Sequence, residues 1–364
     1  MDRSAPRVAA EGTAGDRPGH DGPHLALAAG AAGTYTGTMA FLRRRQPVHR
    51  ADPTSPTGRA AGTSRTSAAG APGGPAAPPR PPVDIGAATA TGRRAENQDR
   101  YAVGPAWAVV SDGVGGHAGG ARAAQLTVDA VAAALAPLPW PPTAGTAEPY
   151  PGDGRVGRGE EGRGGPRGAV GGALAAGARE ANAGVRAGRT GDPSVGTMGA
   201  TLTAAAATAL GSGGSRWLLA SVGDSPAWLV TPAGLARITD DHTVAAALVR
   251  SGVISPGDAA THPGRHVLVQ AVGTEDRIAP DIVAVDLAPG DALVLASDGV
   301  SDVLDDAAVA AAVADPTAAA AGGGDAEAAA RRLVTAALAA GSTDNVTAVV
   351  VRHLARSTGD DAAG

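Results

Sequence analysis

The hydrophobic pattern divides the chain into one domain and two tails. Residues 1–82 are rich in Pro, Gly, Ala, Ser and Thr and show almost no hydrophobic periodicity. Such a segment has too little apolar surface to offset the entropy of ordering its backbone, so we expect it to be disordered. The same expectation applies to residues 356–364. Between them, residues 83–355 alternate short apolar runs with longer Ala-rich stretches, which predicts one domain with a large core.

Within this domain, apolar runs bounded by Gly, Pro and Asp predict strands, and Ala-rich stretches bounded by Pro or Gly predict helices. The strands are expected at 101–103, 107–110, 200–207, 217–222, 227–231, 282–287, 292–296 and 345–351. The helices are expected at 119–135, 169–187, 243–251 and 325–339. Residues 141–168 are rich in Pro and Gly and are expected to form a flexible insertion. Antiparallel-type strands with helices grouped between them favour an α+β layered domain.

Two of the apolar runs end in the same three residues, Ser-Asp-Gly. Val109–Val114 and Val294–Val300 each predict a buried strand with one carboxylate, Asp112 or Asp298, at its C-terminal end. A third acid, Asp344, precedes the last predicted strand. Asp-Gly alone is more typical of a hairpin turn, but the flanking residues are too apolar and too rich in glycine for one. Carboxylates gathered at one rim repel one another without a cation, so the pattern predicts a Mg²⁺ or Mn²⁺ site.

A glycine and an arginine add to this predicted site. Gly113 has no side chain, which lets its carbonyl and the Asp112 carboxylate approach one ion together. Arg94 precedes another acid, Asp99, by five residues, just before the first predicted strand. A guanidinium grips phosphate oxygens in a bidentate fork, so an arginine beside a metal site favours phosphate binding. Taken alone, Arg94 is more typical of a polar surface loop.

The composition excludes several classes of protein. The 364 residues include no Cys, which excludes disulfides, thiolate metal sites and a cysteine nucleophile. All 30 basic residues are Arg, and the lack of Lys excludes a Walker-A phosphate loop and Schiff-base chemistry. A net charge of −5, with one basic cluster at Arg43–Arg45, argues against nucleic-acid binding. No strongly apolar run of about 20 residues predicts a membrane span, so the cytoplasm is the expected location.

Taken together, these motifs resemble those of the metal-dependent protein phosphatases of type 2C (PPM), bacterial branch. Agreement of this many motifs in the order typical of the family is not expected by chance. The motifs are Arg94-x-x-Asn97-Gln98-Asp99, Ser111-Asp112-Gly113-Val114-Gly115-Gly116-His117, Met198-Gly199-Ala200-Thr201-Leu202, Val222-Gly223-Asp224-Ser225, Asp241-His242-Thr243, His262-Pro263, Ser297-Asp298-Gly299 and Asp344-Asn345.

The resemblance implies a fold, an activity and a set of site residues. The implied fold is a four-layer α-β-β-α sandwich of two antiparallel sheets flanked by helices. The implied activity is hydrolysis of phosphoserine and phosphothreonine by direct attack of a water that bridges two Mn²⁺ or Mg²⁺ ions. The implied partners are phosphoproteins made by bacterial Ser/Thr kinases, which indicates a role in signalling. Arg94 is implied to orient the phosphate, and the implied metal-binding residues are Asp99, Asp112, Gly113, Asp298 and Asp344.

Some positions depart from the family pattern and leave alternatives open. Gln98 stands where many members have Glu, Ala200 replaces a usual Thr, and Pro226 replaces a usual Arg. These changes motivate one alternative, a pseudo-phosphatase that only binds phosphoproteins. A second alternative is a regulatory phosphatase dedicated to one partner, whose specificity would lie in the insertion at 141–168 or in the N-terminal tail. A third ion stays open, because the position expected for its acid is occupied by Gly196-Thr197 and Asp192 lies several residues too early.

The sequence assigns no catalytic or metal-binding role to the histidines. His117 lies five residues after Asp112, where a loop histidine is at least as well supported as a general acid. His262 and His266 have the spacing of a helical metal pair, but the Pro-Gly that follows His262 breaks any helix there. His242 and Asp224 resemble family positions that shape the sheet and its loops.

Overall fold

A computed structural model describes residues 83–115, 118–139, 156–158, 168–191, 198–211, 214–314 and 325–354. The strands are β1 (Val83–Ala90), β2 (Arg100–Val103), β3 (Trp107–Ser111), β4 (Gly113–Val114), β5 (Val156–Arg158), β6 (Gly199–Ala200), β7 (Leu202–Gly211), β8 (Gly214–Val222), β9 (Ala227–Thr231), β10 (Gly234–Arg237), β11 (Asp281–Leu287), β12 (Ala292–Ala296) and β13 (Val346–His353). The helices are α2 (Ala118–Leu135), α3 (Gly168–Gly191), α4 (Val244–Arg250), α5 (Pro256–Ala259), α6 (Asp298–Ser301), α7 (Asp306–Val313) and α9 (Ala326–Ala339).

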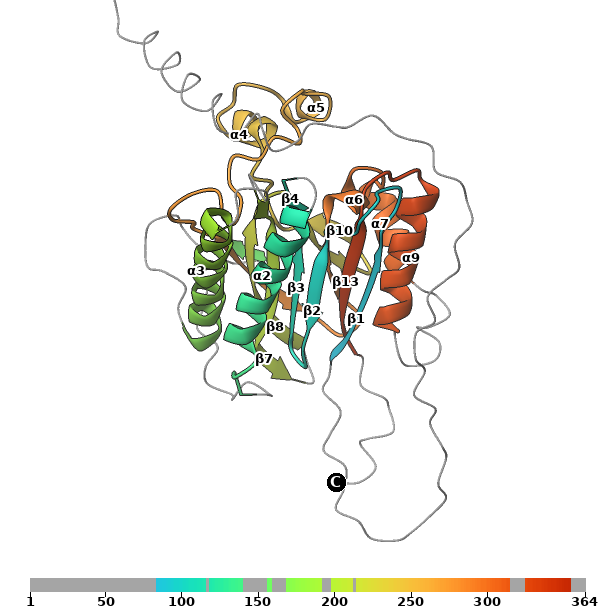
Figure 1. Ribbon diagram of the computed structural model, residues 1–364. Helices are drawn as coiled ribbons and strands as arrows, with labels where there is room; N and C mark the ends of the chain where they lie inside the picture. Colours follow the sequence, from blue (N-terminus) through green and yellow to red (C-terminus); the bar gives the residue numbers. More distant parts are fainter. Residues whose placement is uncertain are drawn as a thin grey trace, which may run out of the picture. The chain divides into compact units, whose positions relative to one another are not determined.

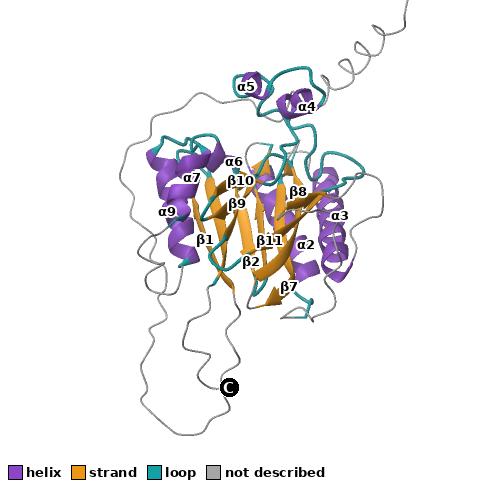
Figure 2. Cartoon of the chain, turned by 180° about the vertical axis from the view of Figure 1, so that it is seen from behind, coloured by secondary structure: helices purple, strands orange, loops and turns teal. Residues whose placement is uncertain are grey.

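Two antiparallel sheets form the centre of the domain. One has the strand order β1-β13-β12-β9-β10, and the other has the order β2-β3-β7-β8-β11-β5. Helices α2 and α3 cover the outer face of the second sheet, and α7 and α9 cover the outer face of the first (Figure 1). The view from behind shows the same layers (Figure 2). The predicted four-layer α-β-β-α sandwich is therefore confirmed.

The central strands are apolar on both faces because each face packs against another layer. On β8, Trp217 and Leu219 point into the core between the sheets, whereas Leu218 and Ala220 pack toward α2 and α3. β12 alternates in the same way, with Leu293 and Leu295 between the sheets. Successive side chains of a strand point to opposite faces, so burial of both faces produces the continuous apolar runs of the sequence.

Most predicted elements are present, and the differences have local causes. The strands predicted at 101–103 and 107–110 are present as β2 and β3, and they pair antiparallel with each other. β1 was not predicted, because Gly86 and several alanines give Val83–Ala90 a weak strand signal. β10 and the short helices α5, α6 and α7 were also not predicted.

Much of the predicted insertion at 141–168 lies outside the described residues. Val156–Arg158 within it forms β5, which pairs antiparallel with β11, and Gly168 begins α3. The predicted disordered tails, 1–82 and 356–364, also lie outside the described residues. Within the described part of the chain, no helix is both long and apolar enough to cross a membrane.

Candidate metal centre

Three chain segments bring acidic side chains to the same end of the two sheets. Asp112 lies between β3 and β4, Asp298 is the first residue of α6 after β12, and Asp344 lies two residues before the start of β13. Because β12 and β13 are antiparallel neighbours, the end of one and the start of the other lie at the same edge. Figure 1 shows β4 and α6 at this end of the sheets. Asp298 is buried, and Asp112 and Asp344 are partly buried.

Two glycines allow these segments to approach one another closely. A Cβ atom on Gly299 would lie 2.0 Å from the carbonyl oxygen of Asn345, so only glycine fits beside the Asp344 segment. A Cβ atom on Gly113 would lie 2.2 Å from the Gly120 carbonyl oxygen and 2.9 Å from that of Gln98. The Ser-Asp-Gly pattern thus has a steric basis, because the glycine lets the carboxylate before it reach the shared rim.

Asn345 fixes the loop that carries Arg94. Its side chain is buried, and its Nδ2 donates hydrogen bonds to the carbonyl oxygens of Thr91 (2.8 Å) and Glu96 (2.9 Å). Its Oδ1 accepts a hydrogen bond from the backbone N–H of Gln98 at 2.8 Å. One buried carboxamide therefore holds the loop at both of its ends. Since a buried amide that loses its partners costs about 1–3 kcal/mol, these bonds constrain the loop strongly.

Arg94 extends from this loop to the carboxylate of Asp344. Arg94 Nη2 lies 2.6 Å from Asp344 Oδ2, and the Arg94 side chain is 56% exposed. A guanidinium held beside the acidic rim, with most of its surface open to solvent, is suited to receive a second anion. The structure thus brings the predicted arginine to the predicted acids.

Asp99 is a deeply buried acid of this rim, 3% exposed like Asp298. Its Oδ2 accepts a hydrogen bond from Ser297 Oγ at 2.7 Å, whereas its buried Oδ1 has no hydrogen-bond partner among the described residues. Burial raises the pKa of Asp99 to about 7, and the negative charges of Asp298 and Asp344 add to this rise. A buried carboxylate oxygen without a donor, beside further carboxylates, fits a divalent cation.

A threonine between β6 and β7 supports Asp112. The backbone N–H of Asp112 donates to Thr201 Oγ1 at 2.8 Å, and the Thr201 N–H donates to the Asp112 carbonyl oxygen at 2.9 Å. Thr201 Oγ1 also lies 2.6 Å from Ser225 Oγ. These contacts fix the backbone of Asp112 directly before Gly113.

Two departures from the family pattern occupy buried positions that bond through their backbones. The N–H of Ala200 donates to the carbonyl oxygen of Val272, and its own carbonyl accepts from the Val272 N–H. The carbonyl oxygen of Pro226 accepts from the Ala296 N–H at 3.0 Å. The Ala200 N–H and carbonyl and the Pro226 carbonyl are backbone groups that these residues still possess, so neither substitution removes these contacts.

A second group of possible ligands lies beside the first and includes a histidine. Asp224, His266 and Asp298 each offer one ligand atom, and these atoms all lie within 4.8 Å of one another. Asp224 and Asp298 are buried, and His266 is partly buried. The sequence interpretation gave Asp224 and His266 structural and positional roles. Their chemical types were visible in the sequence, but nothing local in the pattern relates residue 266 to residue 224 or 298.

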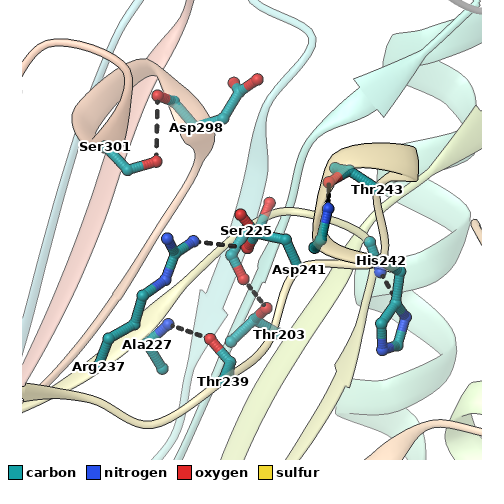
Figure 3. A network of polar contacts seen from close by, with 12 residues as sticks. Thr203, Ser225, Ala227, Arg237, Thr239, Asp241, His242, Thr243, Asp298 and Ser301 are labelled. Atoms are coloured by element: carbon teal, nitrogen blue, oxygen red, sulfur yellow. Dashed lines mark hydrogen bonds and ion pairs between the residues drawn. The ribbon is translucent and has the colours of Figure 1, made fainter. Parts of the chain in front are cut away.

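Arg237 and Asp241 form a charged pair near the same rim (Figure 3). Arg237 Nη2 lies 2.5 Å from Asp241 Oδ1, and the guanidinium stacks over the ring of Trp228 at 5.9 Å from its centroid. Burial raises the pKa of Asp241, although the positive charge of Arg237 opposes this shift and the negative charge of Asp298 adds to it. The rim therefore carries further acidic groups on the side toward α4. His117 and Asp192 of the sequence interpretation lie outside the described residues.

The raised pKa of Asp99 predicts a pH-dependent stability of the metal-free protein. Between pH 4 and 7 the folded protein retains a proton that the unfolded chain has released, so stability from this group falls as pH rises through that window. We expect a loss on the order of a few kcal/mol in chelator, which Mn²⁺ reverses at pH 7. Thermal melts between pH 4 and 8 measure it.

In these melts, Asp99→Asn should flatten the fall, whereas Glu180→Gln on the exposed face of α3 should leave it unchanged. Equal pH profiles for the wild-type protein and the Asp99→Asn variant would contradict the assignment of the raised pKa to Asp99.

Comparisons with known proteins place this geometry in a family. The family profile described as "Protein phosphatase 2C" matches residues 88–339. The Ser/Thr protein phosphatase PstP of Mycobacterium tuberculosis is 32% identical over 216 residues, which are 59% of this chain and 36% of PstP. The Ser/Thr phosphatase stp of Listeria innocua is 34% identical over 110 residues, 30% of this chain and 42% of that protein. The chain thus spans about a third to two fifths of these relatives.

Solved structures agree with this assignment. The catalytic domain of PstP in complex with two manganese ions has a TM-score of 0.56 at 28% identity, covering 74% of this chain and 97% of that one. The phosphatase MsPP of Mycobacterium smegmatis, in complex with cacodylate, has a TM-score of 0.56 at 30% identity, with coverages of 74% and 97%. With a sandwich fold, an acidic rim and a profile that matches most of the domain, this chain belongs to the protein phosphatase 2C family.

Proposed function

We propose that the chain is a metal-dependent protein Ser/Thr phosphatase. The observation that supports this most strongly is the convergence of Asp112, Asp298 and Asp344 at one rim, with Arg94 beside them. Relatives with this family's fold are named Ser/Thr phosphatases, and one of them holds two manganese ions. Its proposed substrates are phosphoserine and phosphothreonine proteins made by bacterial Ser/Thr kinases, and its proposed location is the cytoplasm.

The residues of the rim have distinct proposed roles. Asp112 and the Gly113 carbonyl would hold one Mn²⁺ or Mg²⁺ ion, and Asp112 would share the second with Asp298 and Asp344. Asp99 would support this site through its second carboxylate oxygen. Two bound ions neutralise phosphate charge and lower the pKa of a water so that it becomes the nucleophile.

Arg94 would bind and orient the phosphate, because its guanidinium already lies over the acidic rim. In the absence of substrate it pairs with Asp344, so phosphate binding exchanges one anionic partner for another. That exchange keeps the guanidinium paired throughout the reaction. Arg94 therefore contributes mainly to substrate affinity, whereas Asp298 contributes to holding metal.

Two substitutions separate these roles. Asp298→Ala should lower kcat by about 100-fold or more, because a buried metal-holding carboxylate is lost. Arg94→Ala should instead raise KM about 10-fold or more, since a charge-assisted hydrogen bond contributes about 1.5–3 kcal/mol. Hydrolysis of p-nitrophenyl phosphate and a phosphothreonine peptide, with Mn²⁺ and with chelator, measures both effects.

The neighbouring exposed Arg93 provides the matched control, and Arg93→Ala should leave both constants nearly unchanged. Equal, mild effects of Asp298→Ala and Arg94→Ala would contradict the division of roles. A folded protein that binds Mn²⁺ without any turnover would instead favour the pseudo-phosphatase alternative.

A double-mutant cycle tests whether Asn345 positions Arg94. Asn345→Ala should raise KM several-fold by releasing the loop at both ends. Arg94→Ala in that background should then add little, because the arginine has already lost its position. Steady-state kinetics of the two single variants and the double variant give the coupling.

Asn182 supplies a control with similar local bonding. It is also buried, and its carboxamide bonds the Glu275 carbonyl and the Gly273 N–H in a different loop. Asn182→Ala should lower the melting temperature yet combine additively with Arg94→Ala. Additive effects for Asn345→Ala as well would leave it a purely structural residue.

A further inference from the structure

Ser297 is a capping-type residue that does not cap its helix. It occupies the N-cap position of α6, where a serine hydroxyl ordinarily accepts a hydrogen bond from the first turn, but it makes no such bond. The N-cap side chains of α4, α5, α7 and α9 all accept a hydrogen bond from the first turn of their helices. The Ser297 hydroxyl is directed instead to the carboxylate of Asp99, at 2.7 Å from Oδ2.

The other hydrogen bonds at Ser297 determine where its hydroxyl proton points. Its Oγ accepts from the Thr347 N–H at 3.0 Å, and its own N–H donates to the Thr347 carbonyl oxygen at 3.0 Å. A hydroxyl has one proton to donate, and an ionised carboxylate can only accept, so the Ser297 proton goes to Asp99 Oδ2. Within the described part of the chain, the buried Oδ1 has no hydrogen-bond partner. The serine thus occupies one carboxylate oxygen and leaves the other open.

A ring of polar groups holds this pair in place. Thr347 lies opposite Thr89 in the pairing of β13 with β1, and their hydroxyl oxygens are 2.7 Å apart. Thr89 Oγ1 accepts from Asn97 Nδ2 at 2.9 Å, and Asn97 Oδ1 accepts from the Asp99 N–H at 3.0 Å. The bonds therefore begin at the Asp99 backbone and return, through Thr347 and Ser297, to its carboxylate. Asn97, a motif residue without a part in the proposed reaction, closes this ring.

The two hydroxyls also favour the charged form of the acid. Burial raises the pKa of Asp99 to about 7, and hydrogen bonding by Ser297 and Thr347 opposes this rise. The ionised carboxylate is the form that binds a cation. Groups that hydrogen-bond a metal ligand fix its orientation, and their loss typically weakens metal binding about 10- to 100-fold.

We infer that the hydroxyls of Ser297 and Thr347 are positioning groups of the metal centre, which hold Asp99 so that its Oδ1 is presented to a divalent cation. Ser297 gives up the stabilisation of a helix cap for this contact. The inference rests on the proposed function, because the orientation of Asp99 affects metal binding only if the rim holds a cation.

Calorimetric titration of the full chain with Mn²⁺ at neutral pH tests this without turnover. Ser297→Ala should weaken Mn²⁺ binding about 10-fold or more. Thr347→Val removes a hydroxyl but keeps the branched shape, and it should weaken binding about 3-fold or more. Thr347→Ser keeps the hydroxyl and should stay within about 2-fold of the wild-type protein. Wild-type affinity in a folded Ser297→Ala variant, or in Thr347→Val, would overturn the inference.

Ser111 provides the matched control, because it precedes the other Asp-Gly pair and is also buried. Its hydroxyl donates to the Thr201 carbonyl oxygen at 2.6 Å and not to an acid. Ser111→Ala should therefore lower the melting temperature yet change Mn²⁺ affinity less than about 2-fold. A loss of affinity equal to that of Ser297→Ala would show that any buried serine near the rim has this effect, and it would overturn the inference.

A double-mutant cycle tests whether Ser297 acts through Asp99. In an Asp99→Asn background, Ser297→Ala should weaken Mn²⁺ binding less than about 2-fold further, because the carboxylate that it orients is already gone. Additive losses of affinity would overturn the inference, since they would assign Ser297 an effect independent of Asp99.

Hydrolysis of p-nitrophenyl phosphate, measured in parallel, separates this inference from the proposed function. In Ser297→Ala, the Mn²⁺ concentration for half-maximal rate should rise about 10-fold, whereas the rate at saturating Mn²⁺ should recover to near that of the wild-type protein. Mn²⁺ binding that weakens as expected, without hydrolysis by the wild-type protein, would overturn the proposed function alone. Hydrolysis with unchanged Mn²⁺ affinity in the variants would overturn this inference alone, and a wild-type protein that binds no Mn²⁺ would overturn both.

Discussion

The burial of several carboxylates at one rim is the constraint on which the rest of this structure depends. Asp99 and Asp298 are each 3% exposed, and burial with neighbouring charge raises the pKa of Asp99 to about 7. The surrounding backbone holds the acids together against their mutual repulsion through close approaches at Gly113 and Gly299. Without a cation, the acids of the rim therefore lower the stability of the folded protein. A cation that neutralises the rim removes this cost and stabilises the fold.

The sandwich concentrates chemistry at one end because its strands end there. β12 ends immediately before Asp298, and β13 begins after Asp344, so two antiparallel neighbours deliver both acids to one edge. The second sheet contributes Asp112 through the end of β3. Asp112 and Asp298 thus directly follow strands and Asp344 lies just before one, while Arg94 stands on a loop that one buried carboxamide holds.

The sequence predicted the parts of this site that have a local pattern. An apolar run followed by Ser-Asp-Gly identified Asp112 and Asp298, because buried strands and tight approaches both leave marks in adjacent residues. The group of Asp224 and His266 left no such mark, since the Gly-Asp-Ser and His-Pro-Gly contexts are typical of turns. Only the folded chain relates these turns to α6. β1 was missed for the opposite reason, because its small residues give no strong signal although its pairing with β13 is regular.

The pairing of β1 with β13 also indicates how this domain could be circularly permuted. Val83 lies opposite His353, whereas Ala90 lies opposite Val346 at the end that carries the acidic rim. Eight residues of strand separate the two ends by roughly 25 Å. The first and last residues of the paired strands are therefore neighbours on the side away from the site. A circular permutant that joins them, with new termini in a remote loop, would keep every loop of the acidic rim intact.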